Sequence, residues 1–169
     1  MVARHGGNPE ADPEADALVA FEPGQVCAVL SADCLPVLFC NLSGDRIGAA
    51  HAGWRGLAGG ILQAAVRAME EEPDGLMAWL GPAIGPEVYE VGSEVTAAFP
   101  EEFPAGFKSR GDRWLMDLYT LARLKLAKVG VRSVYGGGFC TMTDRENFFS
   151  YRRDGVTGRM ASLIWLDQS

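Results

Sequence analysis

The stretch VCAVLSADCLPVLFC at residues 26–40 decides the fold. It contains two apolar runs, residues 26–30 and 35–40, on either side of a short polar connection at residues 31–34. Apolar runs of this length, bounded by a polar segment, are typical of buried strands that are joined tightly. The pattern therefore predicts two consecutive strands, with Asp33 and Cys34 held at their junction.

Similar patterns predict further strands and helices along the chain. Strands are expected at residues 17–21, 46–51, 76–80, 131–135 and 159–166. Apolar residues at helical spacing predict a helix from about residue 53 to residue 71 and another over residues 115–129. Ser93 is a candidate cap for a short helix that ends at Phe99. Residues 81–92 and 100–111 are expected to be loops.

The order of these elements predicts the fold class. Strands and helices mix without a strict βαβ rhythm, which favours an α+β fold over a doubly wound parallel sheet. We expect mixed β-sheets with helices packed outside. Because no internal repeat or long linker divides the sequence, we expect a single domain over residues 1–169.

Composition narrows the classes of partner. The net charge of −7 argues against a nucleic acid, because neutralising phosphates requires clustered Lys and Arg. No apolar stretch reaches the roughly 18 residues that a membrane span needs, so no membrane association is expected. Four cysteines without a targeting segment indicate reduced thiols and a cytoplasmic location. Nothing in the sequence indicates an obligatory protein partner.

Cys34 and His51 each lie at the end of a predicted strand, beside a turn. A thiolate and a neutral imidazole are both good zinc ligands. The same pair could act as a nucleophile and its base, or be a buried thiol and an ordinary strand-end histidine. Asp33 is a candidate general acid or base, or an orienting group, although a turn residue needs neither role.

The segment HAGWRG at residues 51–56 predicts a strand, a glycine-rich turn and a helix start. Free N–H groups at such a start bind anions. Arg55 could clamp a phosphate, while Gly53 and Gly56 would let the backbone approach it. Alternatively, the glycines only permit tight packing, and Arg55 pairs with a surface carboxylate.

Two arginines and a second histidine complete the candidates. Arg152 and Arg153 follow aromatic residues in FFSYRRD at residues 148–154, where they could hold an anionic or planar ligand. They could equally form a network that ties down a loop. His5 is the other histidine of the chain and a weak candidate for a further metal ligand.

Several segments together resemble the YfiH family, formerly described as laccase-like multicopper polyphenol oxidases. The resemblance rests on six segments in order: ADAL at 15–18, SADCLPVL at 31–38, HAGWRG at 51–56, WLGPAIGP at 79–86, FFSYRRD at 148–154 and TGRMA at 157–161. It implies a purine nucleoside phosphorylase acting on adenosine, inosine and methylthioadenosine, which also deaminates adenosine. Its partners would be a nucleoside and phosphate.

The resemblance also implies a zinc ion held by two histidines and one cysteine. Two of these ligands match Cys34 and His51. The third belongs to a motif, QVHG, that has no counterpart here, and His5 does not match it. We therefore expect a chain that lacks an N-terminal segment of the family.

Three other functions stay open at this stage. The first is a copper oxidase of laccase type, although two histidines are few for several copper ions. The others are a metal-free Cys–His hydrolase and a non-enzymatic scaffold.

Overall fold

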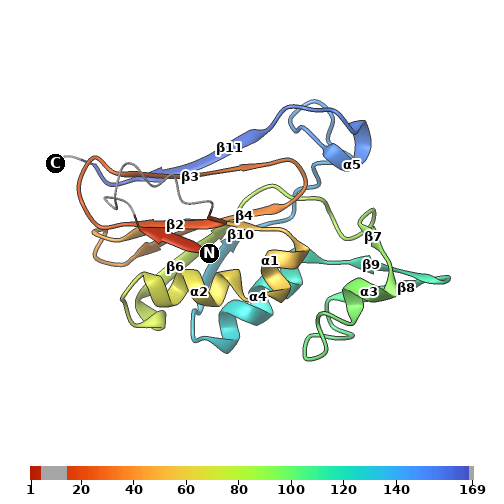
Figure 1. Cartoon of the computed structure of the whole chain (residues 1–169), viewed down its shortest axis with the longest axis horizontal. Coiled ribbons are helices and arrows are strands. Elements are labelled where there is room, and N and C mark those ends of the chain that lie inside the picture. Colours follow the sequence, from red (N-terminus) through yellow and green to blue (C-terminus); the bar gives the residue numbers. More distant parts are fainter. Residues whose placement is uncertain (5–14, 168–169) are drawn as a thin grey trace.

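The central layer of the molecule is a six-stranded sheet. The structure, a computed structural model, describes residues 1–4 and 15–167. In sheet order the strands are β1 (Val2–Arg4), β2 (Ala17–Ala20), β5 (Ile47–Ala52), β4 (Leu35–Asn41), β6 (Leu76–Leu80) and β10 (Ser133–Gly136) (Figure 1). The outermost pairs, β1–β2 and β6–β10, are parallel, whereas the pairs between them are antiparallel. The sheet is therefore mixed, as predicted.

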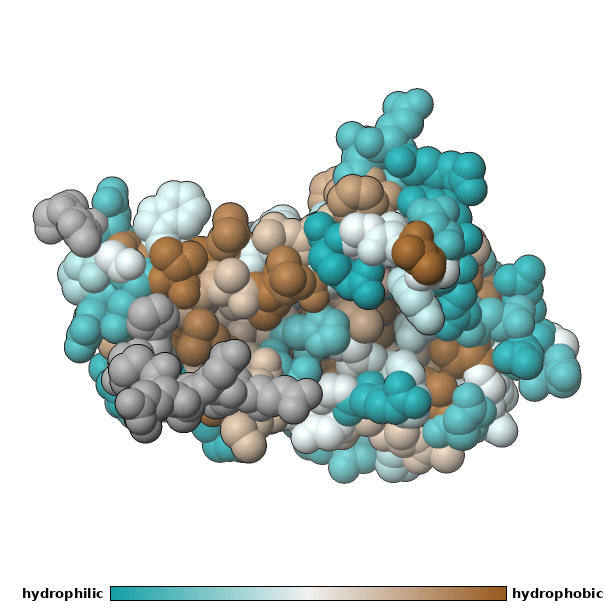
Figure 2. Space-filling view, turned by 45° about the horizontal axis from the view of Figure 1, so that its top comes forward, coloured by the Kyte–Doolittle hydropathy of each residue, from teal (hydrophilic) through white to brown (hydrophobic). Residues whose placement is uncertain are grey.

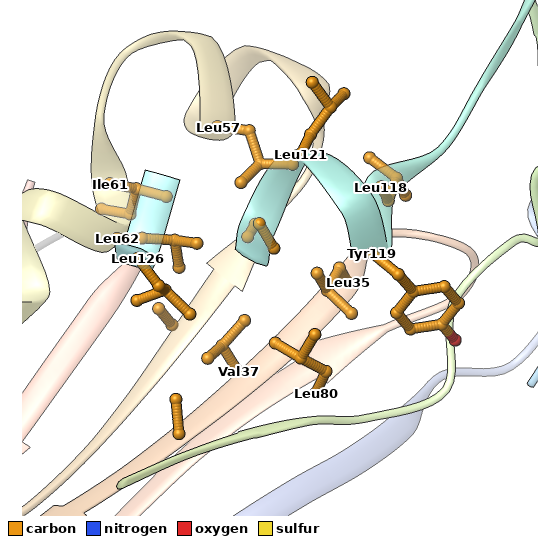
Figure 3. Close-up of a cluster of buried hydrophobic side chains, with 14 of the residues drawn as sticks. Leu35, Val37, Leu57, Ile61, Leu62, Leu80, Leu118, Tyr119, Leu121 and Leu126 are labelled. Carbon is orange, nitrogen blue, oxygen red and sulfur yellow. The ribbon is translucent and has the colours of Figure 1, made fainter. Parts of the chain in front are cut away.

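Helices cover one face of this sheet. They are α1 (Trp54–Ala58), α2 (Ile61–Ala68) and α4 (Leu118–Lys128) (Figure 1). Successive strand residues point to opposite faces, so every second residue of β4 meets the helices. The resulting core contains the fully buried side chains of Leu35, Val37, Leu57, Leu62, Leu80 and Leu121 (Figure 3).

A two-stranded antiparallel ribbon, β3 (Val26–Ser31) and β11 (Met160–Trp165), covers the opposite face (Figure 1). We call this pair the ribbon. Cys27, Val29 and Ser31 point toward the sheet and are buried. The outer face is exposed and apolar, and Figure 2 shows brown residues gathered over it. The described part of the fold thus has three layers: ribbon, sheet and helices.

Smaller elements extend the three layers at one end (Figure 1). A second sheet has the order β7 (Glu90–Val91), β9 (Arg113–Met116), β8 (Phe107–Arg110). The helix α3 (Ser93–Thr96) follows β7, and α5 (Tyr151–Asp154) precedes β11. A single 3-10 turn, η1 (Pro73–Gly75), leads into β6. The α+β fold class with mixed sheets is confirmed.

Several predicted element boundaries are wrong. The helix over residues 53–71 is two helices, because Gly60 takes a left-handed φ of +81° between α1 and α2. The helix over residues 115–129 begins only at Leu118, where the Asp117 carboxylate accepts a hydrogen bond from Thr120 N–H. Gly92, not Ser93, caps α3, and the supposed loop over residues 100–111 contains β8.

No helix of the described part of the chain is long and apolar enough to cross a membrane.

Candidate functional site

The turn between β3 and β4 is fixed by the side chain of Asp33. Its carboxylate accepts hydrogen bonds from Thr141 Oγ1 at 2.6 Å and from the backbone N–H of Arg152 at 2.6 Å. Its carbonyl oxygen accepts a third from Ile84 N–H at 2.9 Å. Asp33 has a φ of +90°, a left-handed conformation that Asp tolerates better than most residues. These bonds hold the backbone of the neighbouring Cys34 in one position.

The Cys34 thiol and the His51 imidazole face the same space. Strand β5 carries His51 opposite Pro36 of β4 and leads almost directly into Gly53. A methyl group on Gly53 would lie 2.9 Å from Cys34 Sγ and 3.9 Å from His51 Cε1. The sulfur and the ring therefore converge on one point. Gly53 keeps that point open because it has no side chain.

Asp16 contacts the far side of the His51 ring. Its Oδ1 lies 3.6 Å from His51 Nδ1, and its carbonyl oxygen accepts a 2.7 Å hydrogen bond from the His51 backbone N–H. The antiparallel pairing of β2 with β5, which sets Ala17 opposite Ala50, produces this contact. A carboxylate beside one ring nitrogen orients an imidazole and leaves the other nitrogen free to bind a metal.

A pocket of about 120 Å³ opens beside Cys34. Asp33, Tyr89, Tyr151 and Arg152 line it together with the cysteine. The Arg152 guanidinium lies 5.1 Å from the centre of the Tyr89 ring, and its Nη1 donates to the Glu90 carbonyl at 3.0 Å. The pocket thus sets a cation and two phenol groups beside the thiol.

Burial and charge set the protonation of this pocket. Burial raises the pKa of the Cys34 thiol, Asp33 and Asp16 raise it further, and Arg159 opposes them. Burial also raises the pKa of Tyr89 to about 12, with Cys34 and Asp33 adding to the effect and Arg152 and Arg55 opposing it. Without a bound cation, the thiol and this phenol therefore stay protonated near neutral pH.

Arg55 and Gly56 line a separate pocket of about 300 Å³, together with Asp16. The Arg55 guanidinium lies 4.4 Å from the centre of the Trp54 ring. Helix α1 has only five residues, so its macrodipole is small and anion binding here would depend mainly on Arg55. Because Asp16 also contacts His51, this pocket adjoins the imidazole.

Arg153 ties down the C-terminal loop. Its guanidinium donates to the carbonyl oxygens of Thr141, Met142 and Phe148 and to the Asp154 carboxylate. All five of its N–H groups are needed for these bonds. This geometry favours the loop-tying alternative for Arg153 and leaves Arg152 as the arginine of the pocket.

The described residues supply two converging metal donors. Among residues 1–4 and 15–167, no group of three His, Cys, Asp or Glu side chains could hold a metal ion. His5 lies outside the described residues. Catalytic zinc usually has three protein ligands, so Cys34 and His51 would form part of such a site.

Sequence reasoning missed four residues around the cysteine: Asp16, Tyr89, Thr141 and Arg159. Asp16 and Arg159 lie inside segments that resemble the family, but no local pattern assigned them a role. Tyr89 lies in a Gly- and Pro-rich segment that was expected to be a loop. Only the pairing of β2 with β5 would have signalled the contact between Asp16 and His51.

Sequence relatives cover nearly the whole chain. The Escherichia coli protein named purine nucleoside phosphorylase YfiH is 55% identical over 163 residues, which are 95% of this chain and 67% of the relative. The Pseudomonas aeruginosa protein named purine nucleoside phosphorylase PA4543 is 51% identical over 166 residues, 93% of this chain and 69% of the relative. The chain thus spans about two thirds of the length of these relatives.

Solved structures agree with this relationship. Neisseria meningitidis protein NMB0706, a member of DUF152, superposes with a TM-score of 0.94 at 51% identity, covering 99% of this chain and 71% of that one. YlmD from Geobacillus stearothermophilus gives 0.88 at 32% identity, covering 99% and 70%. A family model described as multi-copper polyphenol oxidoreductase laccase matches residues 1–167. The chain belongs to this family, which includes the YfiH proteins.

Proposed function

We propose that the protein is a zinc-dependent purine nucleoside phosphorylase. The observation that carries the proposal is the convergence of Cys34 Sγ and His51 on the space above Gly53. The relatives that share this sequence are named purine nucleoside phosphorylases, which supports the same reaction here. Adenosine, inosine and methylthioadenosine are the proposed nucleosides.

Cys34 and His51 would hold the zinc ion. Sulfur and imidazole nitrogen are both ligands that zinc prefers. Asp16 would orient the His51 ring from its far side, and the bonds to Asp33 would fix the cysteine. When bound, zinc supplies a Lewis acid that polarises an oxygen or a water molecule. It would also favour the thiolate form of Cys34, which burial otherwise disfavours.

The arginines around the cysteine would bind phosphate. Arg152 lines the pocket with Cys34, and Arg55 lies close enough to influence the Tyr89 phenol in the same pocket. In phosphorolysis a phosphate oxygen bonds to the anomeric carbon of the ribose while the bond from that carbon to the base nitrogen breaks. The base leaves with the bonding electrons and takes up a proton. Two guanidinium groups would hold the phosphate in line for this attack.

Adenosine deamination is the second activity that we propose. It needs a water molecule to add to the purine ring carbon and ammonia to leave. His51 and Cys34 serve this reaction in the same way, as ligands rather than as nucleophiles. The two activities therefore share one site, and both depend on Cys34.

Two alternative functions fit the geometry less well. The name of the matching family model suggests a copper oxidase, but several copper ions need several imidazole or thiolate ligands each, and this chain contains two histidines. A metal-free hydrolase would need a Cys34 thiolate, whereas burial raises the pKa of this thiol.

The test is a comparison of three proteins: wild type, Cys34→Ala and Cys40→Ala. Metal content is measured by mass spectrometry, and hypoxanthine release from inosine is followed with and without phosphate. Cys40→Ala is the matched control, since Cys40 lies on β4, the strand that directly follows Cys34, and is also partly buried.

We expect phosphate-dependent hypoxanthine release in the wild type and the control, and its loss together with zinc in Cys34→Ala. Full zinc content in Cys34→Ala would disprove the ligand assignment. Diphenol oxidation that requires added copper, without phosphorolysis, would favour the oxidase.

A further inference from the structure

The phenol of Tyr89 is a polar group of the pocket beside Cys34 that the proposed reaction leaves without a role. Tyr89 lies directly before β7 and is only 9% exposed. Its backbone N–H donates to the Gly85 carbonyl at 3.1 Å, and its carbonyl accepts from Met116 N–H at 2.9 Å. Burial and these two bonds hold the ring in one position, so its hydroxyl has a fixed place.

The hydroxyl of this ring is free and accessible. Tyr89 Oη has no hydrogen-bond partner among residues 1–4 and 15–167. In this described part of the chain, the side-chain oxygens that are fully enclosed without a partner are Ser31 Oγ and Gln63 Oε1. The Tyr89 oxygen is not among them, although its residue is buried. It must therefore open into a space that a ligand or solvent can enter.

That space is the pocket beside Cys34. Tyr89 lines this pocket together with Cys34, Asp33 and Arg152. Burial raises the pKa of the phenol to about 12, and among the charged groups that act on it Cys34, Arg152 and Asp33 come before Arg55. Because an electrostatic effect falls with distance, the phenol oxygen lies near the lining groups of the pocket. It stays protonated at neutral pH and can donate a hydrogen bond.

A cation with free N–H groups lies beside this hydroxyl. The Arg152 guanidinium is 5.1 Å from the centre of the Tyr89 ring, and its Nη1 donates to the Glu90 carbonyl. Its Nε and Nη2 have no partner in the described ranges of the chain. Asp33 is the acid of the pocket, but each of its oxygens already accepts a 2.6 Å hydrogen bond. The donors that remain suit the oxygens of a small anion.

The size of the pocket limits what can bind to these donors. Pockets that enclose whole small-molecule ligands measure roughly 300–1,000 Å³. The pocket beside Cys34 has only about 120 Å³, which is too small for a nucleoside with its base and sugar. A tetrahedral oxyanion is much smaller and has an oxygen for each of several donors.

We propose that Tyr89 is a phosphate-binding residue, whose Oη donates a hydrogen bond to one oxygen of the phosphate that Arg152 holds. The inference rests on the proposed phosphorolysis, in which phosphate is a substrate. Two donors from different elements fix the orientation of the phosphate better than a guanidinium alone. Tyr89 thus sets the affinity for phosphate and leaves that for the nucleoside unaffected.

The experiment compares wild type with Tyr89→Phe and Tyr135→Phe. Binding of inorganic phosphate is measured by calorimetry, and hypoxanthine release gives KM for phosphate and for inosine. We expect Tyr89→Phe to weaken phosphate binding and to raise KM for phosphate at least about tenfold, since a hydrogen bond to a charged group is lost. KM for inosine and kcat should not change. Tyr135→Phe is the matched control, because Tyr135 is exposed on β10 and lines neither the pocket beside Cys34 nor that beside Arg55.

Stability separates lost binding from a damaged fold. Tyr89→Phe removes a hydroxyl that bonds to no described residue, so the melting temperature should not fall. Tyr119→Phe should lower it, because the Tyr119 hydroxyl accepts from Ala83 N–H at 2.9 Å and donates to the Phe139 carbonyl at 3.0 Å.

The outcomes distinguish this inference from the proposed function. Phosphate-dependent cleavage of inosine with unchanged phosphate constants in Tyr89→Phe would overturn the role of Tyr89 alone. A loss of stability in Tyr89→Phe as large as that in Tyr119→Phe, or absence of phosphate binding by wild type, would also overturn it. Phosphate binding that weakens in Tyr89→Phe, in a protein that does not cleave inosine, would support the binding role and contradict the proposed function.

Discussion

The two faces of the central sheet differ in packing and in chemistry. On the helix-covered face, Leu35, Val37 and Phe39 of β4 are fully buried among apolar side chains. On the ribbon-covered face, Leu38 and Cys40 of the same strand are only partly buried. His51 of β5 also lies on the ribbon-covered face and is partly exposed. Its neighbours Ala50 and Ala52 point to the other face and belong to the helix-side core.

Along a single strand, residues that stabilise the core therefore alternate with residues that are available for binding or catalysis. The helix face is closely packed and mostly apolar, which gives a large buried apolar area, although α2 contains a buried oxygen without a partner among the described residues, Gln63 Oε1, and α4 contains the buried Lys125. The ribbon face leaves a pocket, an unpaired hydroxyl and a partly exposed imidazole, all of which cost stability and suit binding. Substitutions at adjacent positions should therefore have unlike effects, and the comparison can be tested residue by residue.

The largest effect is expected for truncation on the helix face. Phe39→Ala should lower the free energy of unfolding by about 3–5 kcal/mol, because it removes a fully buried ring and leaves a cavity. Leu38→Ala, one residue away on the ribbon face, should cost less, about 1–2 kcal/mol, since the site is partly open already. Urea denaturation of both variants measures the difference. Equal losses would mean that the ribbon is packed as tightly as the helices.

A smaller loss is expected at the turn that joins the ribbon to the sheet. Asp33→Asn replaces an acceptor of two short hydrogen bonds by an amide that also carries donors, and should cost about 2 kcal/mol of unfolding free energy. Thr141→Val is the matched control, since it removes only the bond to Oδ1 and should cost about 1 kcal/mol. A stable Asp33→Asn protein without turnover would instead assign Asp33 to catalysis.

Gly53 tests whether the open space beside the imidazole is needed for a metal. Its φ of −67° and ψ of 168° suit alanine, so Gly53→Ala introduces no backbone strain. The added methyl would lie 2.9 Å from Cys34 Sγ and displace the sulfur. We predict that zinc affinity, measured by competition with a chelator, falls about tenfold to a hundredfold. The melting temperature should change little.

Gly75→Ala is the control for this substitution. A methyl there would meet only Glu71 side-chain atoms at 3.6 Å or more, an ordinary contact far from the cysteine. It should leave zinc affinity unchanged. If Gly53→Ala binds zinc as tightly as Gly75→Ala does, the sulfur and the imidazole do not share an ion.

The sequence could predict the buried strands of the fold but not the short, exposed ones. Strong apolar runs predicted β3, β4 and β6, because buried strands need little else. The small sheet was missed because β7 has two residues and β8, FKSR, is exposed at three of its four positions. Short exposed strands depend on pairing rather than on their own composition.

The candidate site was predictable only where local sequence carries it. Cys34, His51 and Gly53 lie in two segments with recognisable motifs. Tyr89 and Asp16 reach the same place through the chain path and the register of β2 with β5, which no single segment specifies. Ser31 was read as part of a polar turn, and only the ribbon pairing places its hydroxyl in an apolar layer.

The last prediction concerns the reactivity of two cysteines and needs no substitution in the protein. Cys27 is fully buried between ribbon and sheet, and burial raises its pKa from 9.0 to about 12. Cys140 lies outside these layers. Partial burial acts to raise the pKa of its thiol, but hydrogen bonds from the Thr143 side chain and from the N–H groups of Gly85, Thr143 and Met142 together lower it. Cys140 should therefore have the larger thiolate fraction at any pH below 9.

Alkylation with iodoacetamide, followed by peptide mass spectrometry, measures this contrast. Because the thiolate is the reacting form, the rate at Cys140 should begin to rise at a lower pH than that of an ordinary thiol, whereas Cys27 should stay unmodified up to pH 10 in the folded protein. We expect at least about a tenfold difference in rate at pH 8, and none in denaturant, where burial is lost. Modification of Cys27 at the rate of Cys140 in the folded protein would mean that the ribbon opens. In that case the ribbon face would be a mobile cover rather than a packed layer, and its pocket would not have a fixed shape.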